Sequence, residues 1–413
     1  MADLRVQNGF ITDRGNSLTP VRGEESADLR GNIVLPGLVN AHTHLYSALS
    51  RGMPPPAQKP QNFLEVLDHV WWKLDRALDD DAVYYSALVG AIDAVRNGTT
   101  VVVDHHASPR AIKGSLSIIK QALDEVGLRG VLCYEVTDRG GKKERNEGLD
   151  ENERFIRKNG DNSMVRGLVG AHAPFTLSQE TLHLVGSLAA KLRTGVHIHV
   201  AEDRSDVTDA GENYQCSVVD RLAQNGILKR QSVLAHCVHL DGRDCSDIRR
   251  TECWVVHNPR SNMNNRVGYA PLRRLGDRVA LGTDGFPADM FEEAKIAFLK
   301  RQDSAADQPI DFARLMTGGQ KMVSEIFGAQ FGSLTKGCVA DLVVLEYDPP
   351  TPLTNENALG HVLFGMSSAM VKSVMINGKW VMNDRMLTCV DLREVSEKSR
   401  KAARKLWERI EKL

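Results

Sequence analysis

Eight short apolar runs, separated by longer segments with helical periodicity, constrain the fold of this 413-residue chain most strongly. The runs are rich in Val, Ile, Leu and Gly, and they cover residues 33–41, 99–104, 130–136, 165–171, 195–200, 232–235, 253–256 and 278–282. The helical segments between them include 63–78, 81–96, 112–126, 179–191 and 218–225. Strands that alternate with helices over about 250 residues are typical of a (β/α)8 barrel. A doubly wound open sheet shows the same alternation, so periodicity alone leaves both folds open.

Each predicted strand delivers an ionisable side chain to its C-terminal end. In chain order these residues are His42 and His44, His105 and His106, Glu135, His172, His199, His236, His257 and Asp284. The carboxyl ends of barrel strands all meet at one face, where the active sites of this fold lie. In an open sheet the same residues would be spread along an edge. We therefore predict an α/β protein with a (β/α)8 TIM-like barrel.

The two ends of the chain have a different pattern from the middle. The first ~35 residues are predicted to form short strands with turns, and hairpin signals recur late in the chain at Asn377-Gly378 and Asn383-Asp384. We expect these strand-rich ends to pair and to form one small β module. The predicted division is 1–36 for the first part of this module, 37–336 for the barrel, 337–390 for the second part and 391–413 for a C-terminal helix.

Composition narrows the class of protein. The chain has 52 Lys and Arg against 53 Asp and Glu, and this near balance argues against a nucleic-acid-binding surface as its main function. No run approaches the ~18 uninterrupted apolar residues that span a bilayer, and the N-terminus lacks a secretory signal pattern, so we expect no membrane partner. The seven cysteines are scattered without a CxxC pair, which is typical of a reducing cytoplasm. We expect a cytoplasmic protein.

Three short motifs bring possible metal ligands to the predicted active face. His42 and His44 are two residues apart on a strand, so both imidazoles can face one metal. Glu202 follows His199 by three residues and can reach the attacked atom as a proton shuttle. Asp284 ends the eighth run, where a carboxylate can bind the metal and accept a proton from its water. Each motif alone is weak, but their common position favours a metal-dependent hydrolase.

Two pairs of histidines leave a choice open at this face. His197 precedes His199 by two residues and should point to the same side, so it is a rival ligand. The spacing to Glu202 favours His199. His105 and His106 end the second run together, and strand alternation lets only one of them face the centre.

The phrases PGLVNAHTH, HIHVAE, LAHCVHL, VVHNPRSN and ALGTDG resemble those of the amidohydrolase superfamily, within its deaminase and chlorohydrolase branch of cytosine deaminase-like proteins. The phrases HLYSALSRG, WWKLDRALDDD and GAHAPFTLS are most similar to SsnA-type aminohydrolases. The resemblance covers nearly the whole chain, including a tail, GSLTKGCVADLVVLE, that closes a composite β-sandwich in such enzymes.

The resemblance implies one catalytic divalent metal, Zn2+ or alternatively Fe2+. Its ligands would be the residues that match the motifs: His42, His44, His199 and Asp284. Glu202 matches the proton shuttle, and His236 matches the residue that hydrogen-bonds the attacking hydroxide. Asp284 would also take the proton of the attacking water. A binuclear site would need a bridging Lys or Glu near the fourth strand end, where the sequence GLVGAHAP has none.

The expected substrate contacts are less specific. His172, in the phrase GAHAPFT, matches a position near the substrate, and one of His105 and His106 would line the pocket. Relatives that act on purine nucleosides often have Glu where this chain has Asp75, which is one methylene shorter. Arg260 stands where many relatives have a small residue. It would meet a substrate carbonyl or carboxylate, or else lie at the surface as a solvated guanidinium.

Together these features predict a metal-dependent hydrolytic deaminase that releases ammonia from an amino-substituted N-heterocycle such as a purine, pterin or pyrimidine. The alternative is an amidase or chlorohydrolase that uses the same mononuclear site on a different bond. A non-enzymatic metal-binding protein is the third hypothesis, and the complete ligand set together with Glu202 argues against it. The expected partners are a small heterocyclic substrate and further copies of this chain in a homodimer or higher homo-oligomer.

Overall fold

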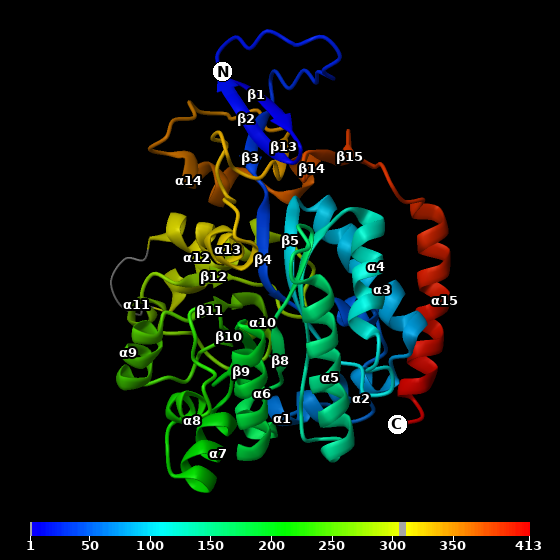
Figure 1. Ribbon diagram of the computed structural model, residues 1–413, viewed down its shortest axis with the longest axis vertical. Helices are drawn as coiled ribbons and strands as arrows, with labels where there is room; N and C mark the ends of the chain where they lie inside the picture. Colours follow the sequence, from blue (N-terminus) through cyan, green and yellow to red (C-terminus); the bar gives the residue numbers. More distant parts are fainter. Residues whose placement is uncertain (1, 305–310) are drawn as a thin grey trace.

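Two parallel sheets with helices around them make up the centre of the protein, as seen in a computed structural model that describes residues 2–304 and 311–413 (Figure 1). The first sheet has the order β4 (Leu38–Thr43), β5 (Thr99–His106), β6 (Arg129–Tyr134) and β7 (Val165–Gly167). The second has the order β8 (Val169–Ala171), β9 (Val196–Val200), β10 (Val233–His236), β11 (Trp254–His257) and β12 (Val279–Leu281). The chain is thus an α/β protein with parallel sheets, as predicted.

Hydrogen bonds join the two sheets at both edges. At one edge β7 and β8 follow each other with only Leu168 between them, and the Leu168 amide donates to the carbonyl of Leu132 on β6 at 3.1 Å. At the other edge the Asp284 amide donates to the carbonyl of His42 at 3.0 Å, and the His44 amide donates to the carbonyl of Asp284 at 3.3 Å. The first and last strands therefore bring His44 and Asp284 side by side.

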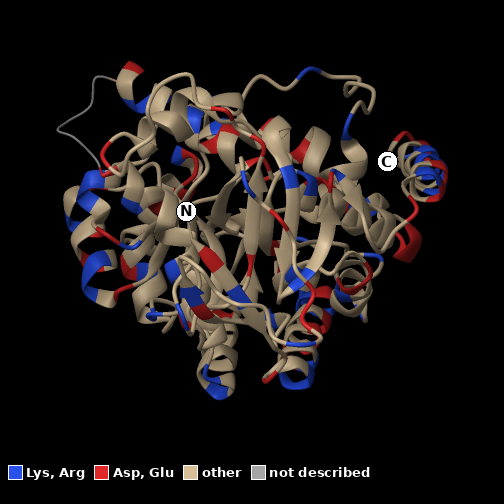
Figure 2. Cartoon of the chain, turned by 90° about the horizontal axis from the view of Figure 1, so that it is seen from above, with Lys and Arg blue, Asp and Glu red and all other residues tan. Residues whose placement is uncertain are grey.

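The strands are Val- and Ile-rich because both of their faces are covered. Every residue of β5, β6 and β9 to β12 is buried, which is the usual state of parallel strands between helices. The larger covering helices are α3 (Asp80–Arg96), α4 (Ser115–Val126), α5 (Gly141–Asn159), α6 (Gln179–Leu192), α12 (Met290–Asp303) and α13 (Phe312–Phe327). Figure 2 shows their Lys, Arg, Asp and Glu residues mixed around the outside, with few charges on the central strands.

Shorter helices lie in the segments between the strands. They are η1 (Leu45–Ser50), α1 (Phe63–Val66), η2 (Leu67–Trp71), α2 (Trp72–Ala77), η3 (Pro174–Thr176), α7 (Arg204–Tyr214), α8 (Val218–Gln224), α9 (Gly242–Thr251), α10 (Pro259–Asn264) and α11 (Leu272–Leu275). Further along the chain lie α14 (Ala358–Gly360), η4 (His361–Gly365) and η5 (Ser368–Met370). Among the described residues, no helix has the length and apolar composition needed to cross a membrane.

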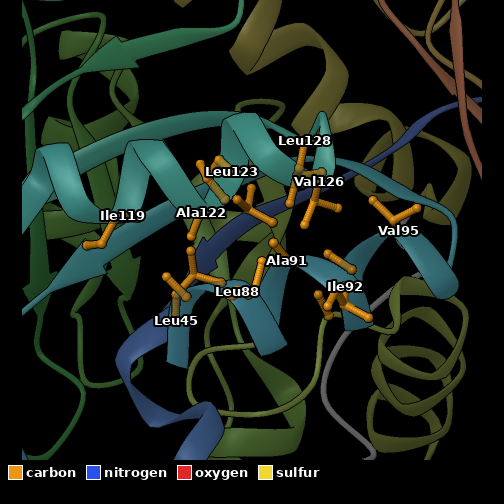
Figure 3. Packing of buried hydrophobic residues seen from close by; sticks show 14 of the residues in the cluster. Leu45, Leu88, Ala91, Ile92, Val95, Ile119, Ala122, Leu123, Val126 and Leu128 are labelled. Atoms are coloured by element: carbon orange, nitrogen blue, oxygen red, sulfur yellow. The ribbon is translucent and has the colours of Figure 1, made fainter. Parts of the chain in front are cut away.

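The apolar core between α3 and α4 fixes the segment that follows His44. Figure 3 shows Leu88 and Ala91 of α3 facing Leu123 of α4, with Leu45 of η1 in the same cluster. The Ser86 hydroxyl donates to the Leu45 carbonyl at 2.8 Å. The core thus holds η1, and with it the end of β4, in place.

Strands from both chain ends share one antiparallel sheet. β3 (Ile33–Pro36) pairs with β13 (Leu342–Leu345), which is followed by β14 (Val371–Ile376), β15 (Lys379–Asn383) and β16 (Met386–Leu387). The run 33–41, predicted as one strand, is divided because Gly37 turns the chain from this sheet into β4. Its amide donates to the carbonyl of Asp341 at 2.7 Å, and a side chain at Gly37 would collide with Thr100.

Two hairpins complete this end of the molecule. β1 (Asp3–Gln7) pairs with β2 (Phe10–Gly15), and the Ile11 amide donates to the Cys338 carbonyl at 2.8 Å. The predicted turn at Asn377-Gly378 joins β14 and β15, with positive φ at both residues, 52° and 75°. Two-residue hairpin turns of type I′ require this conformation.

The last helix, α15 (Leu392–Ile410), lies along α3 and α2 (Figure 1). Its apolar face, which includes Val395, Ala402 and Leu406, is buried in the same core as α3. The Trp407 indole donates to the carbonyl of Leu49 in η1 at 2.9 Å. The helix therefore packs on this chain's own elements and supports the segment after His44.

Candidate metal centre and its cavity

Four histidines from β4 and β9 meet inside the strand ends. His44 and His199 lie nearer the carboxyl ends, with their Nε2 atoms 3.3 Å apart. His42 lies two residues before His44, and its ring centroid is 5.0 Å from that of His199. His197 is two residues before His199, and its Nε2 lies 2.8 Å from Nδ1 of His42. The structure therefore brings together the three histidines predicted as ligands, and places the rival His197 behind His42.

Asp284, three residues after the end of β12, completes the donor set. Its Oδ1 lies 3.0 Å from Nε2 of His44 and 3.7 Å from Nε2 of His42. The residue has a φ of 55°, a conformation that is uncommon outside glycine and often occurs at functional sites. The Ser261 hydroxyl donates to its second oxygen, Oδ2, at 2.5 Å.

The proton positions of these histidines fit a bound cation. Nδ1 of His44 donates to the carbonyl of His105 at 2.6 Å, and Nδ1 of His199 donates to the carbonyl of His172 at 2.7 Å. In a neutral ring each facing Nε2 is then a lone pair, and two lone pairs 3.3 Å apart repel unless a cation or proton lies between them. Nε2 of His42 is buried and has no hydrogen-bond partner among the described residues. Three imidazoles and a carboxylate are a donor set that divalent zinc prefers.

Burial favours the neutral form of two of these imidazoles. It lowers the pKa of His42 to about 3, and it lowers the pKa of His199 well below its usual range. For His44 burial acts in the same direction, but the hydrogen bond and negative charge of Asp284 outweigh it and raise the pKa to about 9. Burial alone would raise the pKa of Asp284, but the hydrogen bonds of His42 and His44 hold it well below its usual range. The carboxylate is therefore ionised among imidazole donors.

Glu202 and His236 lie beside the donor set. Nε2 of His236 is 3.4 Å from Oε2 of Glu202 and 3.8 Å from Oδ2 of Asp284. Burial raises the pKa of Glu202 to about 7, against the opposing effect of His236. A carboxyl group with a pKa near neutrality can both take up and release a proton, which a proton shuttle requires.

The helix α10 and the residue after it supply neutral partners that sequence reasoning missed. Asn262 Oδ1 accepts from Nδ1 of His236 at 2.8 Å, and the Asn265 side-chain amide donates to Oε1 of Glu202 at 3.2 Å. The sequence feature that could have indicated these partners is the run of Ser and Asn in NPRSNMNN, directly after the end of the seventh predicted strand. Such residues recur wherever short side-chain hydrogen bonds fix a loop.

A cavity of about 290 Å³ opens beside these groups. Its walls include His44, His199, Glu202 and Asp284, so it reaches the donor set directly. Its apolar lining comes largely from Phe63, Leu67, Trp71, Trp72, Phe175 and Phe286. A volume near 300 Å³ with aromatic walls and a few polar groups suits a small ligand.

His172 and Asp75 line the cavity, as the sequence suggested for substrate contacts. Nδ1 of His172 is hydrogen-bonded to the Thr176 hydroxyl at 2.7 Å, and its ring lies 6.4 Å from that of Trp72. Oδ2 of Asp75 accepts from Arg139 at 2.9 Å, and its Oδ1 has no hydrogen-bond partner in the described part of the chain. His172 directly follows β8 and Asp75 lies in α2, so the two residues line the cavity from different parts of the chain.

Arg260 lies elsewhere, and neither role considered for it fits. Its side chain is buried behind α10, where Nε pairs with Glu293 and Nη2 donates to the carbonyl of Pro287 at 2.7 Å. Burial raises the pKa of Glu293 to about 7. The guanidinium is used to join α10 to α12 and to the loop after Asp284, so it contacts neither the cavity nor bulk solvent.

His105 and His106 also lie outside the cavity wall. His105 faces the centre, but it lies one layer below the cavity, with Nε2 3.0 Å from the carbonyl of Ala171 and Nδ1 3.4 Å from Oε2 of Glu135. Nε2 of His106 pairs with the Ser108 hydroxyl at 2.9 Å. The prediction that one of the pair faces inward agrees with this geometry, whereas the pocket-lining position belongs to Glu135.

A buried ion cluster forms part of the cavity wall. Nη2 of Arg139 lies 2.9 Å from Oδ2 of Asp75 and 3.0 Å from Oε1 of Glu135, and its guanidinium stacks 4.8 Å from the ring of Trp72. Burial raises the pKa of Asp75 to about 7. Although burial acts the same way on Glu135, the charges of His172, His105 and Arg139 lower its pKa below its usual range. Sequence reasoning missed Arg139, which comes from the loop after β6.

The chain is similar to known proteins over nearly its whole length. The model of the amidohydrolase family matches residues 33–381. A 5′-deoxyadenosine deaminase of Methanothermobacter thermautotrophicus is 30% identical over 417 residues, which cover 97% of this chain and 94% of the relative. A 5-methylthioadenosine/S-adenosylhomocysteine deaminase of Desulforudis audaxviator is 29% identical over 425 residues, covering 99% and 95%.

Among solved structures, a zinc-bound adenosine deaminase of Xanthomonas campestris superposes with a TM-score of 0.82 at 22% identity, covering 98% of this chain and 93% of the other. At this identity the likeness shows the fold. The family model and the sequence relatives together show that the chain belongs to the amidohydrolase family.

Proposed function

We propose that the protein is a metal-dependent aminohydrolase that removes an amino group from an N-heterocycle as ammonia. The observation that carries this proposal is the position of Glu202, a largely buried carboxyl group with a pKa of about 7, on the cavity wall and 3.4 Å from His236. Deamination needs one group that protonates the ring nitrogen and later the departing amine. Glu202 is placed and tuned for that task.

We propose His42, His44, His199 and Asp284 as the ligands of one divalent cation, with Zn2+ the first choice because imidazole and carboxylate donors suit it. When bound, such a cation supplies Lewis-acid chemistry and lowers the pKa of a coordinated water toward about 7. The zinc-bound adenosine deaminase of the same fold supports this choice.

The protein's own residues then account for the proton transfers. Asp284 takes a proton from the attacking water, and His236 orients the attacking oxygen through Nε2. Glu202 protonates the ring nitrogen next to the attacked carbon as the C–O bond forms. The hydroxyl group of the tetrahedral intermediate then gives its proton to the ionised Glu202, which delivers it to the amino group, so that the carbonyl forms, the C–N bond breaks and ammonia leaves. The proton held by Asp284 returns to Glu202 and restores both residues.

We propose a purine nucleoside, in particular an adenosine derivative, as the first substrate class to test. The named relatives act on 5′-deoxyadenosine and 5-methylthioadenosine, and the aromatic walls around Trp72 and Phe175 suit a flat ring. The second oxygen of Asp75, Oδ1, can accept a hydrogen bond from a ligand hydroxyl. His172 is placed to contact the same ligand.

We also propose that the two parallel sheets close into one (β/α)8 barrel and that the terminal strands form a composite β-sandwich. The hydrogen bonds at both sheet edges and the pairing of β3 with β13 support this architecture. The domain limits would be 1–36, 37–336, 337–390 and 391–413. The free cysteines, which include the buried Cys133, suit the reducing cytoplasm that we propose as the location.

The test is ammonia release from a panel of adenosine derivatives, guanine, cytosine and aminopterins by Zn2+-loaded protein. The expected result is turnover of at least one adenosine derivative, with Glu202→Gln inactive and Glu212→Gln, an exposed change on α7, fully active. A metal-loaded wild type that releases no ammonia from any of these compounds would contradict the proposal. Chloride release from a chlorinated heterocycle that survives in Glu202→Gln would favour the chlorohydrolase alternative.

A further inference from the structure

The partner of His42 differs from the partners of the other two histidines in the donor set. His44 and His199 direct Nδ1 to backbone carbonyls, those of His105 and His172. Nδ1 of His42 instead lies 2.8 Å from Nε2 of His197, a second imidazole. Histidines that hold a metal usually direct the other ring N–H to a carboxylate, a carbonyl or water, so this contact needs its own explanation.

The contact arises because the histidines lie in two layers. Residues i and i+2 of a strand share a face and are about 6.6 Å apart along it. His44 and His199 form the layer nearer the cavity, and His42 and His197 form the layer below. The rings of the deeper pair are 4.9 Å apart at an interplanar angle of 74°, and neither residue is exposed to solvent.

If His42 binds a cation through Nε2, the positions of the ring protons of His42 and His197 follow from their hydrogen-bond partners. Two ring nitrogens 2.8 Å apart share one proton. For Nε2 of His42 to offer a lone pair to a cation, that proton belongs to Nδ1 of His42, and Nε2 of His197 accepts it. His197 then carries its own proton on Nδ1, which faces Sγ of Cys133 at 3.7 Å. The Cys133 thiol in turn lies 3.5 Å from the carbonyl of Asp104.

We propose that His197 is a positioning residue that fixes the tautomer and orientation of His42 and thereby sets the affinity of the centre for a divalent cation. The inference rests on the proposed function, because it presumes that His42 binds a metal. It assigns His197 a role different from that of a direct ligand, since its Nε2 is already used by His42. Of the two histidines in HIH, His199 would bind the cation directly and His197 would orient His42 from the layer below.

The test compares the Zn2+ affinity of three variants by competition with a chromophoric chelator. His197→Leu keeps a similar volume and removes the acceptor. In His197→Gln the side-chain oxygen can stand where Nε2 stands, whereas the shorter His197→Asn places it nearer the position of Nδ1. Loss of a partner of this kind typically weakens metal binding by roughly 10–100-fold. We expect that loss in the Leu and Asn variants, with Gln close to the wild type and with His183→Gln, an exposed change on α6, unchanged.

Equal affinity of the wild type, Leu and Asn proteins would overturn the inference, as would a Gln variant as weak as Asn. If thermal melting shows that His197→Leu does not fold, the comparison of Gln with Asn decides alone. A wild type that binds Zn2+ tightly but releases no ammonia would contradict the proposed function and leave this affinity comparison valid. A wild type that binds no divalent cation would overturn both.

Discussion

Arg139 holds the carboxylate of Asp75 by one oxygen only. Nη2 of Arg139 lies 2.9 Å from Oδ2, while Oδ1 has no hydrogen-bond partner within the described residues. The guanidinium is itself fixed by Glu135 at 3.0 Å and by the face of Trp72. Asp75 is therefore a positioned acceptor on the cavity wall.

The first prediction concerns the pH dependence of substrate binding through Asp75. Burial raises its pKa to about 7, so the carboxyl is neutral below that pH and an ionised acceptor above it. A substrate hydroxyl donates more strongly to the ionised form. We expect the Kd of an unreactive nucleoside to fall as the pH rises from about 6 to about 8, and to stay constant in Asp75→Asn.

Isothermal titration at several pH values measures this dependence. Asp68→Asn, a change of an exposed carboxylate on η2, should follow the wild type. An Asp75→Asn protein with the wild-type pH dependence would show that another group causes it.

The second prediction concerns Arg260, which joins α10 to α12. Removing one partner of a buried ion pair leaves an uncompensated charge and typically costs about 3–5 kcal/mol. Arg260→Met should therefore lower the free energy of unfolding by up to that amount, because Glu293 remains buried and must either stay charged without a partner or take up a proton. Substrate KM, measured at a temperature where the variant is folded, should not change.

Denaturant unfolding checks the loss of stability. The double variant Arg260→Met with Glu293→Leu should recover much of it, because neither charge remains. Arg250→Met, which breaks an exposed pair with Asp247, should change stability by about 0–1 kcal/mol. A raised KM in an Arg260→Met protein of unchanged stability would contradict this prediction and indicate that Arg260 contacts the substrate.

The third prediction concerns removal of the metal. The Nε2 atoms of His44 and His199 face each other at 3.3 Å, where a bound cation can accept a lone pair from each ring. Zn2+ at about 100 times its Kd should stabilise the fold by about 2.7 kcal/mol relative to the chelator-treated protein. His199→Ala should lose this Zn2+-dependent rise in Tm, and the exposed change His183→Ala should keep it. A Tm that is independent of Zn2+ in the wild type would argue against the donor set.

The strand pattern made much of the fold, and the grouping of the candidate ligands, predictable. The exact two-residue period of a strand places His42 and His44 on one face, whatever the tertiary partners are. The same period cannot tell His197 from His199, because both face inward. Depth separates them: only the residue nearer the strand end reaches the cavity.

Residues whose roles depend on distant partners were not predictable. The sequence left Arg260 either as a substrate contact or as a surface guanidinium, yet in the folded chain it pairs with Glu293 on α12. Arg139 had no motif, and its importance arises only when β6 and α2 bring Glu135 and Asp75 together. A single sequence contains no local signal for such contacts.

The last prediction concerns Asn265, whose side-chain amide donates to Oε1 of Glu202 at 3.2 Å. This donor orients the carboxyl group and leaves Oε2 facing His236 at 3.4 Å. A hydrogen bond to a charged group contributes about 1.5–3 kcal/mol, so Asn265→Ala should lower kcat by roughly 10–150-fold. Bound Zn2+ should be unchanged, because Asn265 contacts Glu202, the proposed proton shuttle, and is not one of the proposed ligands. Steady-state kinetics with metal analysis separates the outcomes, with Asn213→Ala on the exposed side of α7 as the control. A raised KM with kcat intact would mean that Asn265 contacts the substrate and does not position Glu202.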